Sequence, residues 1–131
     1  MGFKDVTTAM ALVRSHALRQ NKQLRDDVKI RCGTSRKLVC TSKGCPFFVR
    51  FKKRSTGELP WVIVEVHLFH EEHCTSVAKP KPRELVQLDV FKNAMAANPS
   101  ISASKLAAVI QDESGMVVEP HTADRARRLL P

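Results

Sequence analysis

The sequence predicts an α+β fold: an N-terminal helix, a small four-stranded antiparallel sheet, and then a helical segment of three short helices. Three observations predict it. Apolar residues recur at helical spacing over residues 5–22, alternate with polar residues over residues 27–78, and return to helical spacing further on. The change in period divides the chain into two parts, residues 1–78 and 83–131. The linker between them, Ala78-Lys-Pro-Lys-Pro82, contains two prolines and is expected to be extended and solvated.

Residues 5–22 are expected to form an amphipathic helix, because apolar side chains recur every three or four residues. Its cationic residues come late, where the helix dipole favours positive charge. The apolar stripe consists of Val6, Met10, Val13, Ala17 and Leu18.

Four strands are expected next, and the alternation of apolar and charged residues predicts each of them. The first expected strand, residues 28–32, alternates Lys29 and Arg31 with apolar residues, so both cations should project from the outer face and Cys32 should pack in the core. Turns are expected at Gly33-Thr-Ser and Ser55-Thr-Gly57. The other three expected strands are residues 36–40, 46–53 and 61–66.

Three helices are expected in the second part, over residues 83–97, 102–114 and about 120–130. Asn98-Pro99 ends the first, Ser102 can cap the second, and Pro120 suits the first turn of the third. Short helices with tight connections predict a bundle of helix-turn-helix type.

Two groups of metal-ligating residues are the most specific signal in the chain. Cys40 and Cys45 flank a short loop, and a cluster of histidines and a cysteine follows the last expected strand. This spacing is typical of a zinc site with mixed sulfur and nitrogen ligands. The small sheet buries little apolar surface, so a bound metal would supply missing stability. The distal cluster contains His67, His70, His73 and Cys74.

Cys40 and Cys45 are predicted to be two of the ligands, whereas the sequence leaves several choices for the other two. His70 could ligate with Cys74, His70 could ligate with His73, or His73 could ligate with a residue outside the cluster. We favour one structural Zn²⁺ on Cys40, Cys45, His70 and Cys74, with His73 as the alternative to Cys74. The position of His67 on its expected strand indicates a surface residue or a partner that orients a ligand.

The net charge of +9 favours a polyanionic partner, chiefly nucleic acid. A membrane is the competing polyanion, but the chain has no apolar run of about 18 residues and no stretch arranged like a signal peptide. We therefore expect an intracellular protein whose cysteines stay reduced.

A set of short motifs occurs in a fixed order along nearly the whole chain. They are Cys40, Cys45-Pro46, Trp61-Val-Ile-Val, His70, Cys74, Asn98-Pro-Ser-Ile-Ser-Ala103, Leu106, Gly115-Met-Val-Val118 and Ala123-Asp-Arg-Ala-Arg-Arg128. Their order resembles the N-terminal zinc-finger region of Mutator-like (MULE) transposases, within the WRKY-type and FLYWCH-type zinc-finger group. The resemblance implies recognition of double-stranded DNA in the nucleus, at element ends or by a domesticated host protein.

In WRKY-type fingers the strand before the first zinc cysteine enters the major groove, and the matching segment here is residues 28–37. Arginine can read guanine through two hydrogen bonds, and lysine mainly supplies charge. The expected leading contacts are Lys29, Arg31, Arg36 and Lys37. The expected phosphate contacts are Lys43, Arg50, Lys52 and Lys53.

The transposase catalytic domain follows this region in the family, and no set of carboxylates here replaces it, so the chain is not expected to be an enzyme. Glu71, Glu72 and Asp112 are too scattered for two-metal chemistry. The alternative function is a protein-interaction module, in which zinc staples a scaffold and the C-terminal helices bind a partner or a second copy. The terminal helix could also touch DNA through Arg125, Arg127 and Arg128.

Overall fold

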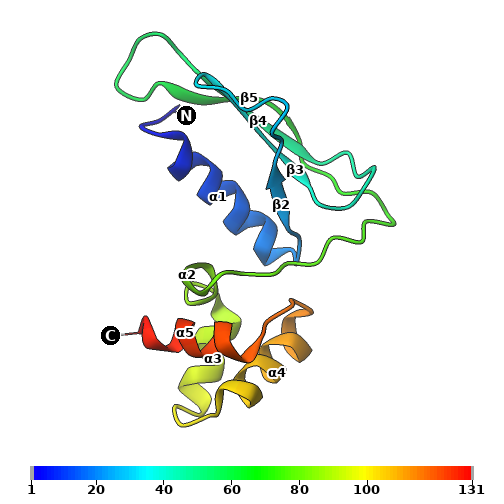
Figure 1. Cartoon of the computed structure of the whole chain (residues 1–131), viewed down its shortest axis with the longest axis vertical. Helices are drawn as coiled ribbons and strands as arrows, with labels where there is room; N and C mark the ends of the chain where they lie inside the picture. The colour runs from blue at the N-terminus through cyan, green and yellow to red at the C-terminus, as the bar shows by residue number, and fades with distance from the viewer. Residues whose placement is uncertain (1, 131) are drawn as a thin grey trace. The chain divides into compact units, whose positions relative to one another are not determined.

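The computed structural model describes residues 2–130 and divides into two compact units, Met1–Ser76 and Val77–Pro131 (Figure 1). We call them the N-terminal unit and the C-terminal unit and describe each by itself. The first is a mixed α+β unit and the second is helical.

The N-terminal unit contains one helix and a five-stranded antiparallel sheet of order β1-β5-β4-β3-β2. The helix α1 (Val6–Arg19) lies along one face of the sheet (Figure 1). It is shorter than expected and begins at Asp5, whose side chain accepts a hydrogen bond from the Thr8 backbone N–H at 2.8 Å. The strands are β1 (Gly2–Phe3), β2 (Leu24–Asp26), β3 (Ser35–Cys40), β4 (Phe48–Lys53) and β5 (Trp61–His67).

The expectation of four strands is wrong, and so is the strand expected at residues 28–32. The chain turns there because the Asp27 carbonyl oxygen accepts hydrogen bonds from the Ile30 and Arg31 N–H groups, and its side chain accepts one from Lys29 N–H at 3.1 Å. Val28 is consequently 71% exposed. The strand beside β3 is β2 instead, and the fifth strand is the short β1.

Cys32 was expected in the core, but its side chain is exposed. It forms an isolated bridge with Ser35 just before β3, outside the buried cluster. The apolar alternation that suggested a strand therefore lies on a solvated turn.

The core of the N-terminal unit lies between α1 and the face of the sheet that we call the inner face. The opposite, outer face is defined by the register, in which Val39 pairs with Phe48 and Phe48 with His67. In the next row Lys37 pairs with Arg50 and Arg50 with Glu65. Buried residues of the inner core include Ala9, Met10, Ala17, Leu38, Val49, Phe51 and Trp61.

The C-terminal unit contains four helices rather than three: α2 (Pro82–Leu85), α3 (Asp89–Ala97), α4 (Ala103–Ser114) and α5 (Pro120–Arg128). The first expected helix is broken because the backbone of Leu88 is extended, with φ −82° and ψ 140°. Leu85, Leu88 and Phe91 are all buried, so their helical spacing concealed the break.

The other helix ends in this unit follow the expected signals. Ser102 caps α4 by accepting from the Lys105 N–H, and Gly115 ends it in a left-handed conformation with φ 77°. The segment expected to be a solvated linker is instead partly buried at Ala78 and Pro80. The Ala78 carbonyl accepts a hydrogen bond from Val117 N–H at 2.8 Å, which ties this segment to the C-terminal unit.

Candidate metal centre

Four potential metal ligands come together in the N-terminal unit, and we call them the metal cluster: Cys40, Cys45, His70 and Cys74. Cys40 ends β3, Cys45 lies in the loop before β4, and the other two lie in the segment after β5. One ligand atom from each residue lies within 4.8 Å of all the others. The cluster can therefore hold a single metal ion.

The distances within the cluster fit a tetrahedral ion. Cys40 Sγ lies 3.5 Å from Cys74 Sγ, and His70 Nδ1 lies 3.4 Å from Cys45 Sγ and 3.6 Å from Cys74 Sγ. A zinc–sulfur bond of about 2.3 Å implies tetrahedral ligand–ligand edges of about 3.8 Å. All three cysteines are free thiols, and their sulfur separation is far from the roughly 2.05 Å of a disulfide.

The turn that presents Cys40 and Cys45 is a tight metal-binding knuckle. The Ser42 N–H points to Cys40 Sγ at 3.5 Å, and the Cys45 N–H donates to the Ser42 carbonyl at 3.2 Å. Gly44 has φ 82°, a left-handed conformation that side chains other than glycine rarely adopt. These bonds aim both sulfur atoms to the same side of the loop.

The tripeptide Cys-Thr-Ser occurs twice, at residues 40–42 and 74–76, and the two copies bind each other crosswise. Thr41 Oγ1 lies 2.6 Å from Ser76 Oγ, and Ser42 Oγ lies 3.3 Å from Thr75 Oγ1. The Thr75 N–H also donates to Ser42 Oγ at 3.0 Å. The role of these residues was not predicted from the sequence, although the repeated tripeptide is visible in it. They hold Cys74 beside Cys40.

The ring of His70 is oriented by stacking. It lies parallel to the ring of Phe47, with centroids 4.4 Å apart and an interplanar angle of 7°. Its Nδ1 faces the sulfurs, and its buried Nε2 has no hydrogen-bond partner among the described residues. Burial and the nearby charge of Lys22 both lower the pKa of His70, which keeps the imidazole neutral and able to donate a lone pair to a metal.

The thiols of Cys40 and Cys74 differ in how readily they ionise. Burial raises the pKa of Cys40 to about 11. Burial also opposes the Cys74 thiolate, but hydrogen bonds from Ser76 and Cys40 outweigh it and lower the pKa of Cys74. A metal ion must displace these protons to bind, so its affinity should rise with pH.

The remaining predicted metal residues lie outside the cluster. His73, the alternative fourth ligand, is exposed, and the structure places Cys74 with the other ligands instead. His67 is exposed at the end of β5, where its ring meets that of Phe69 edge-on at 6.1 Å.

Lys22 stabilises the segment that carries Cys74. Its ammonium group donates to the carbonyl oxygens of Cys74 at 3.4 Å and Ser76 at 3.3 Å. Three thiolates around a dication leave a net charge of −1, which a neighbouring cation stabilises. This role of Lys22 was not predicted from the sequence, because the contacts join residues more than 50 positions apart.

We expect Lys22→Met to weaken zinc binding about fivefold, equivalent to about 1 kcal/mol for a partly exposed charge-assisted contact. Lys22→Arg should lose less, because it keeps the charge. Competition with a chromophoric chelator measures the affinity, and Lys4→Met, which removes an exposed cation beside α1, is the control. Equal affinities for the two methionine variants would contradict this role.

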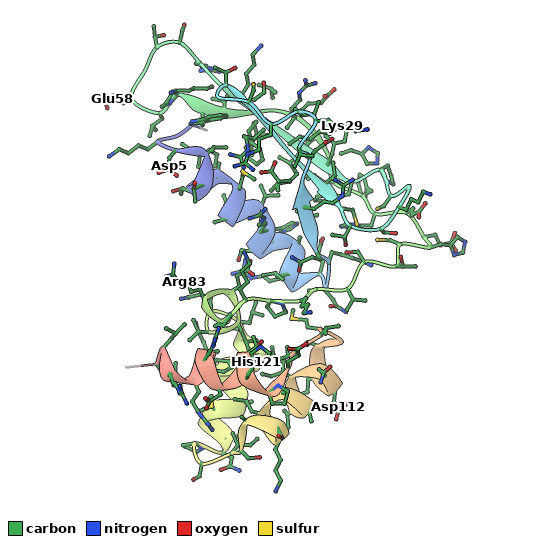
Figure 2. The ribbon with its side chains drawn as sticks, in the orientation of Figure 1. Asp5, Lys29, Glu58, Arg83, Asp112 and His121 are labelled. Carbon is green, nitrogen blue, oxygen red and sulfur yellow. The ribbon has the colours of Figure 1, made fainter. Side chains whose placement is uncertain are left out.

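Most of the cations predicted to contact DNA are exposed, but they do not lie on a single strand. Lys29 and Arg31 lie on the turn between β2 and β3, and the Lys29 side chain projects away from α1 (Figure 2). Lys43 lies on the knuckle loop and Lys53 ends β4. The register places Lys37, Arg50 and Lys52 on the outer face.

Two arginines change the predicted surface. Arg36 lies on the inner face, where its half-buried guanidinium pairs with Asp26, so it is not a free cation of the outer face. Arg25 was not predicted, because β2 was not, and the register places it on the outer face opposite Val39. In the C-terminal unit, Arg127 and Arg128 both pair with Asp124.

These features define the class of the protein: an α+β unit with one site of three cysteines and a histidine for a metal ion, followed by a helical unit. No protein-family model, curated protein or solved structure matches the chain. None of the described helices is long and apolar enough to span a membrane.

Proposed function

We propose that the chain is a zinc-dependent module that binds double-stranded DNA, of the transposase-derived kind that its sequence resembles. It would act in the nucleus as a binding module and not as an enzyme. The observation that carries the proposal is the cationic outer face, because two of its strands, β3 and β4, border the metal cluster. We call Arg25, Lys37, Arg50 and Lys52 the cationic face.

The arrangement of these cations supports an anionic partner. Lys37 and Arg50 are direct cross-strand neighbours, and like charges in that position destabilise a sheet. The only acidic residue that the register places beside them is Glu65, which lies 3.8 Å from Arg50 at an exposed position. An exposed pair of this kind contributes little. Phosphate groups would relieve the repulsion and release counterions on binding.

Zinc fits the metal cluster chemically. Three thiolates and an imidazole are soft and borderline donors, which suit zinc better than magnesium or calcium. Four protein ligands leave no open position for water, which is typical of a structural site. Cys40, Cys45, His70 and Cys74 would hold the ion and fix the ends of β3 and β5, and with them the strands that display the cationic face.

We expect the full chain to bind duplex DNA with an affinity that falls as salt rises and that is lost when zinc is removed. Lys37→Ala with Arg50→Ala should lower the slope of log affinity against log salt by about 2, or about 1 per phosphate contact. Lys105→Ala with Lys92→Ala, exposed lysines of the C-terminal unit, is the matched control. Fluorescence anisotropy with a labelled duplex measures both.

Binding that ignores both salt and chelator would contradict the proposal. The alternative, a zinc-stapled protein-interaction module, predicts weak binding that the Lys37 and Arg50 substitutions leave unchanged.

A further inference from the structure

We propose that the outer face also binds unpaired bases of single-stranded DNA, through a row of rings formed by Phe48, His67 and Phe69, which we call the ring row. This inference rests on the proposed function, because it takes DNA as the ligand. It adds a second mode of binding, by stacking on base faces that a duplex keeps inside its helix.

The exposure of Phe69 is the first observation. Of the other large aromatic side chains of the sheet region, Phe47, Phe51 and Trp61 are buried, and Phe3 and Phe48 are partly buried. Phe69 is 76% exposed, although it lies only one residue before the ligand His70. A ring held in solvent beside an ordered site is available to an external partner.

The geometry places the three rings next to one another. Phe48 on β4 and His67 on β5 are direct cross-strand partners on the outer face. The ring of Phe69 then meets that of His67 at 6.1 Å with an interplanar angle of 79°. The ring row therefore runs from β4 across β5 to the segment that leads into the metal cluster.

The cationic face borders this row. Lys37 Nζ lies 4.6 Å from the centre of the Phe48 ring, and Arg50 is the cross-strand neighbour of Lys37. Aromatic rings beside backbone-tracking cations are the two components with which proteins bind single strands. An apolar protein segment would offer Lys37 and Arg50 no negative charge, so charge complementarity favours a nucleic acid.

The sheet itself adds space beside the row. Between β4 and β5 the register shifts at Arg50 and Phe51, which leaves a bulge near Val64. A shallow hollow of about 410 Å³ opens there on the outer face. Its lining residues are Ser35, Arg50, Lys52, Val64 and Glu65. A strand whose bases stack on the ring row could place its phosphates at this hollow.

The test compares two labelled probes of equal charge, an oligothymidylate of about 12 nucleotides and an abasic oligomer of the same length. We expect the zinc-loaded full chain to bind the oligothymidylate about tenfold more tightly, and Phe69→Leu to remove most of that difference. Phe69→Trp should restore it, and base stacking should quench the added tryptophan. Leu68→Ala, an exposed apolar neighbour, is the matched control and should keep the difference.

Equal binding of the two probes by the unsubstituted chain would overturn the inference, as would equal losses in Phe69→Leu and Leu68→Ala. Metal content is measured for each variant, and if Phe69→Leu releases zinc the comparison is repeated with His67→Ala. A labelled duplex separates the two proposals. If the chain binds the duplex but binds the oligothymidylate and the abasic oligomer equally, only the ring-row inference is contradicted. If it prefers the oligothymidylate but does not bind the duplex, only the proposed function is contradicted.

Discussion

Replacing Cys40 or Cys74 by serine is expected to release the metal and unfold the N-terminal unit, whereas Cys32→Ser should do neither. Structural zinc binds finger peptides with an apparent free energy of about 10–16 kcal/mol at pH 7. A unit of this size has a total stability of only about 4–11 kcal/mol at the usual value per residue. The unit should therefore not remain folded without the ion. Cys32 is the natural control, because it is exposed and lies outside the metal cluster.

The histidines offer a second matched pair for the same experiment. His70→Ala should release zinc, because its Nδ1 faces the sulfurs, whereas His73→Ala should retain it, because His73 is exposed. Metal content after dialysis and the fluorescence of Trp61, the single tryptophan, report binding and folding. Zinc loss from His73→Ala with retention in His70→Ala would contradict the ligand set.

The pH dependence has a definite sign. The bound ion requires thiolates and a neutral imidazole, while the free cluster holds protons, above all on Cys40 with its pKa of about 11. Acid therefore favours the metal-free state. Zinc affinity should fall as the pH is lowered, and the N-terminal unit should lose stability with it.

The sequence predicted elements best where one local rule dominated. The Ser102 cap of α4 and Pro120 in the first turn of α5 were predicted because each follows from short-range chemistry. Prediction failed at Asp27, where two local signals conflicted. The alternation of residues 28–32 predicts a strand, whereas Asp27 favours a turn. The hydrogen bonds of the turn determined the structure. Prediction also failed at Leu88, because a helix break between two buried residues does not change the spacing of the apolar residues.

The residue types of the metal cluster could be predicted from the sequence, but the identity of its fourth ligand could not. Spacing alone could not separate His73 from Cys74, because the two residues are adjacent in the chain. The choice depends on contacts between distant residues, in which Thr75 and Ser76 bind the Cys-Thr-Ser copy at Cys40. The ion pair of Arg36 could not be predicted for the same reason, because its partner Asp26 lies on a strand that was not predicted.

Phe51→Ala and Phe91→Ala are each expected to destabilise one unit by about 3–5 kcal/mol, the usual range for removing a buried phenylalanine. Phe51 is fully buried between α1 and the sheet, and Phe91 is fully buried in the C-terminal unit. The side chain lost in each case leaves a cavity that close-packed neighbours fill only partly.

Trp61 makes the two effects separable, because it is buried in the core of the N-terminal unit and the chain has no other tryptophan. In urea, Phe51→Ala should lower the midpoint of the fluorescence transition, whereas Phe91→Ala should leave that midpoint unchanged and shift only the circular dichroism of the helices. Zinc binding should likewise survive Phe91→Ala. If both substitutions moved the Trp61 transition equally, the two units would have to unfold as one. The metal would then stabilise the helical unit as well as the sheet, because an ion that binds only the folded state stabilises everything that folds with it.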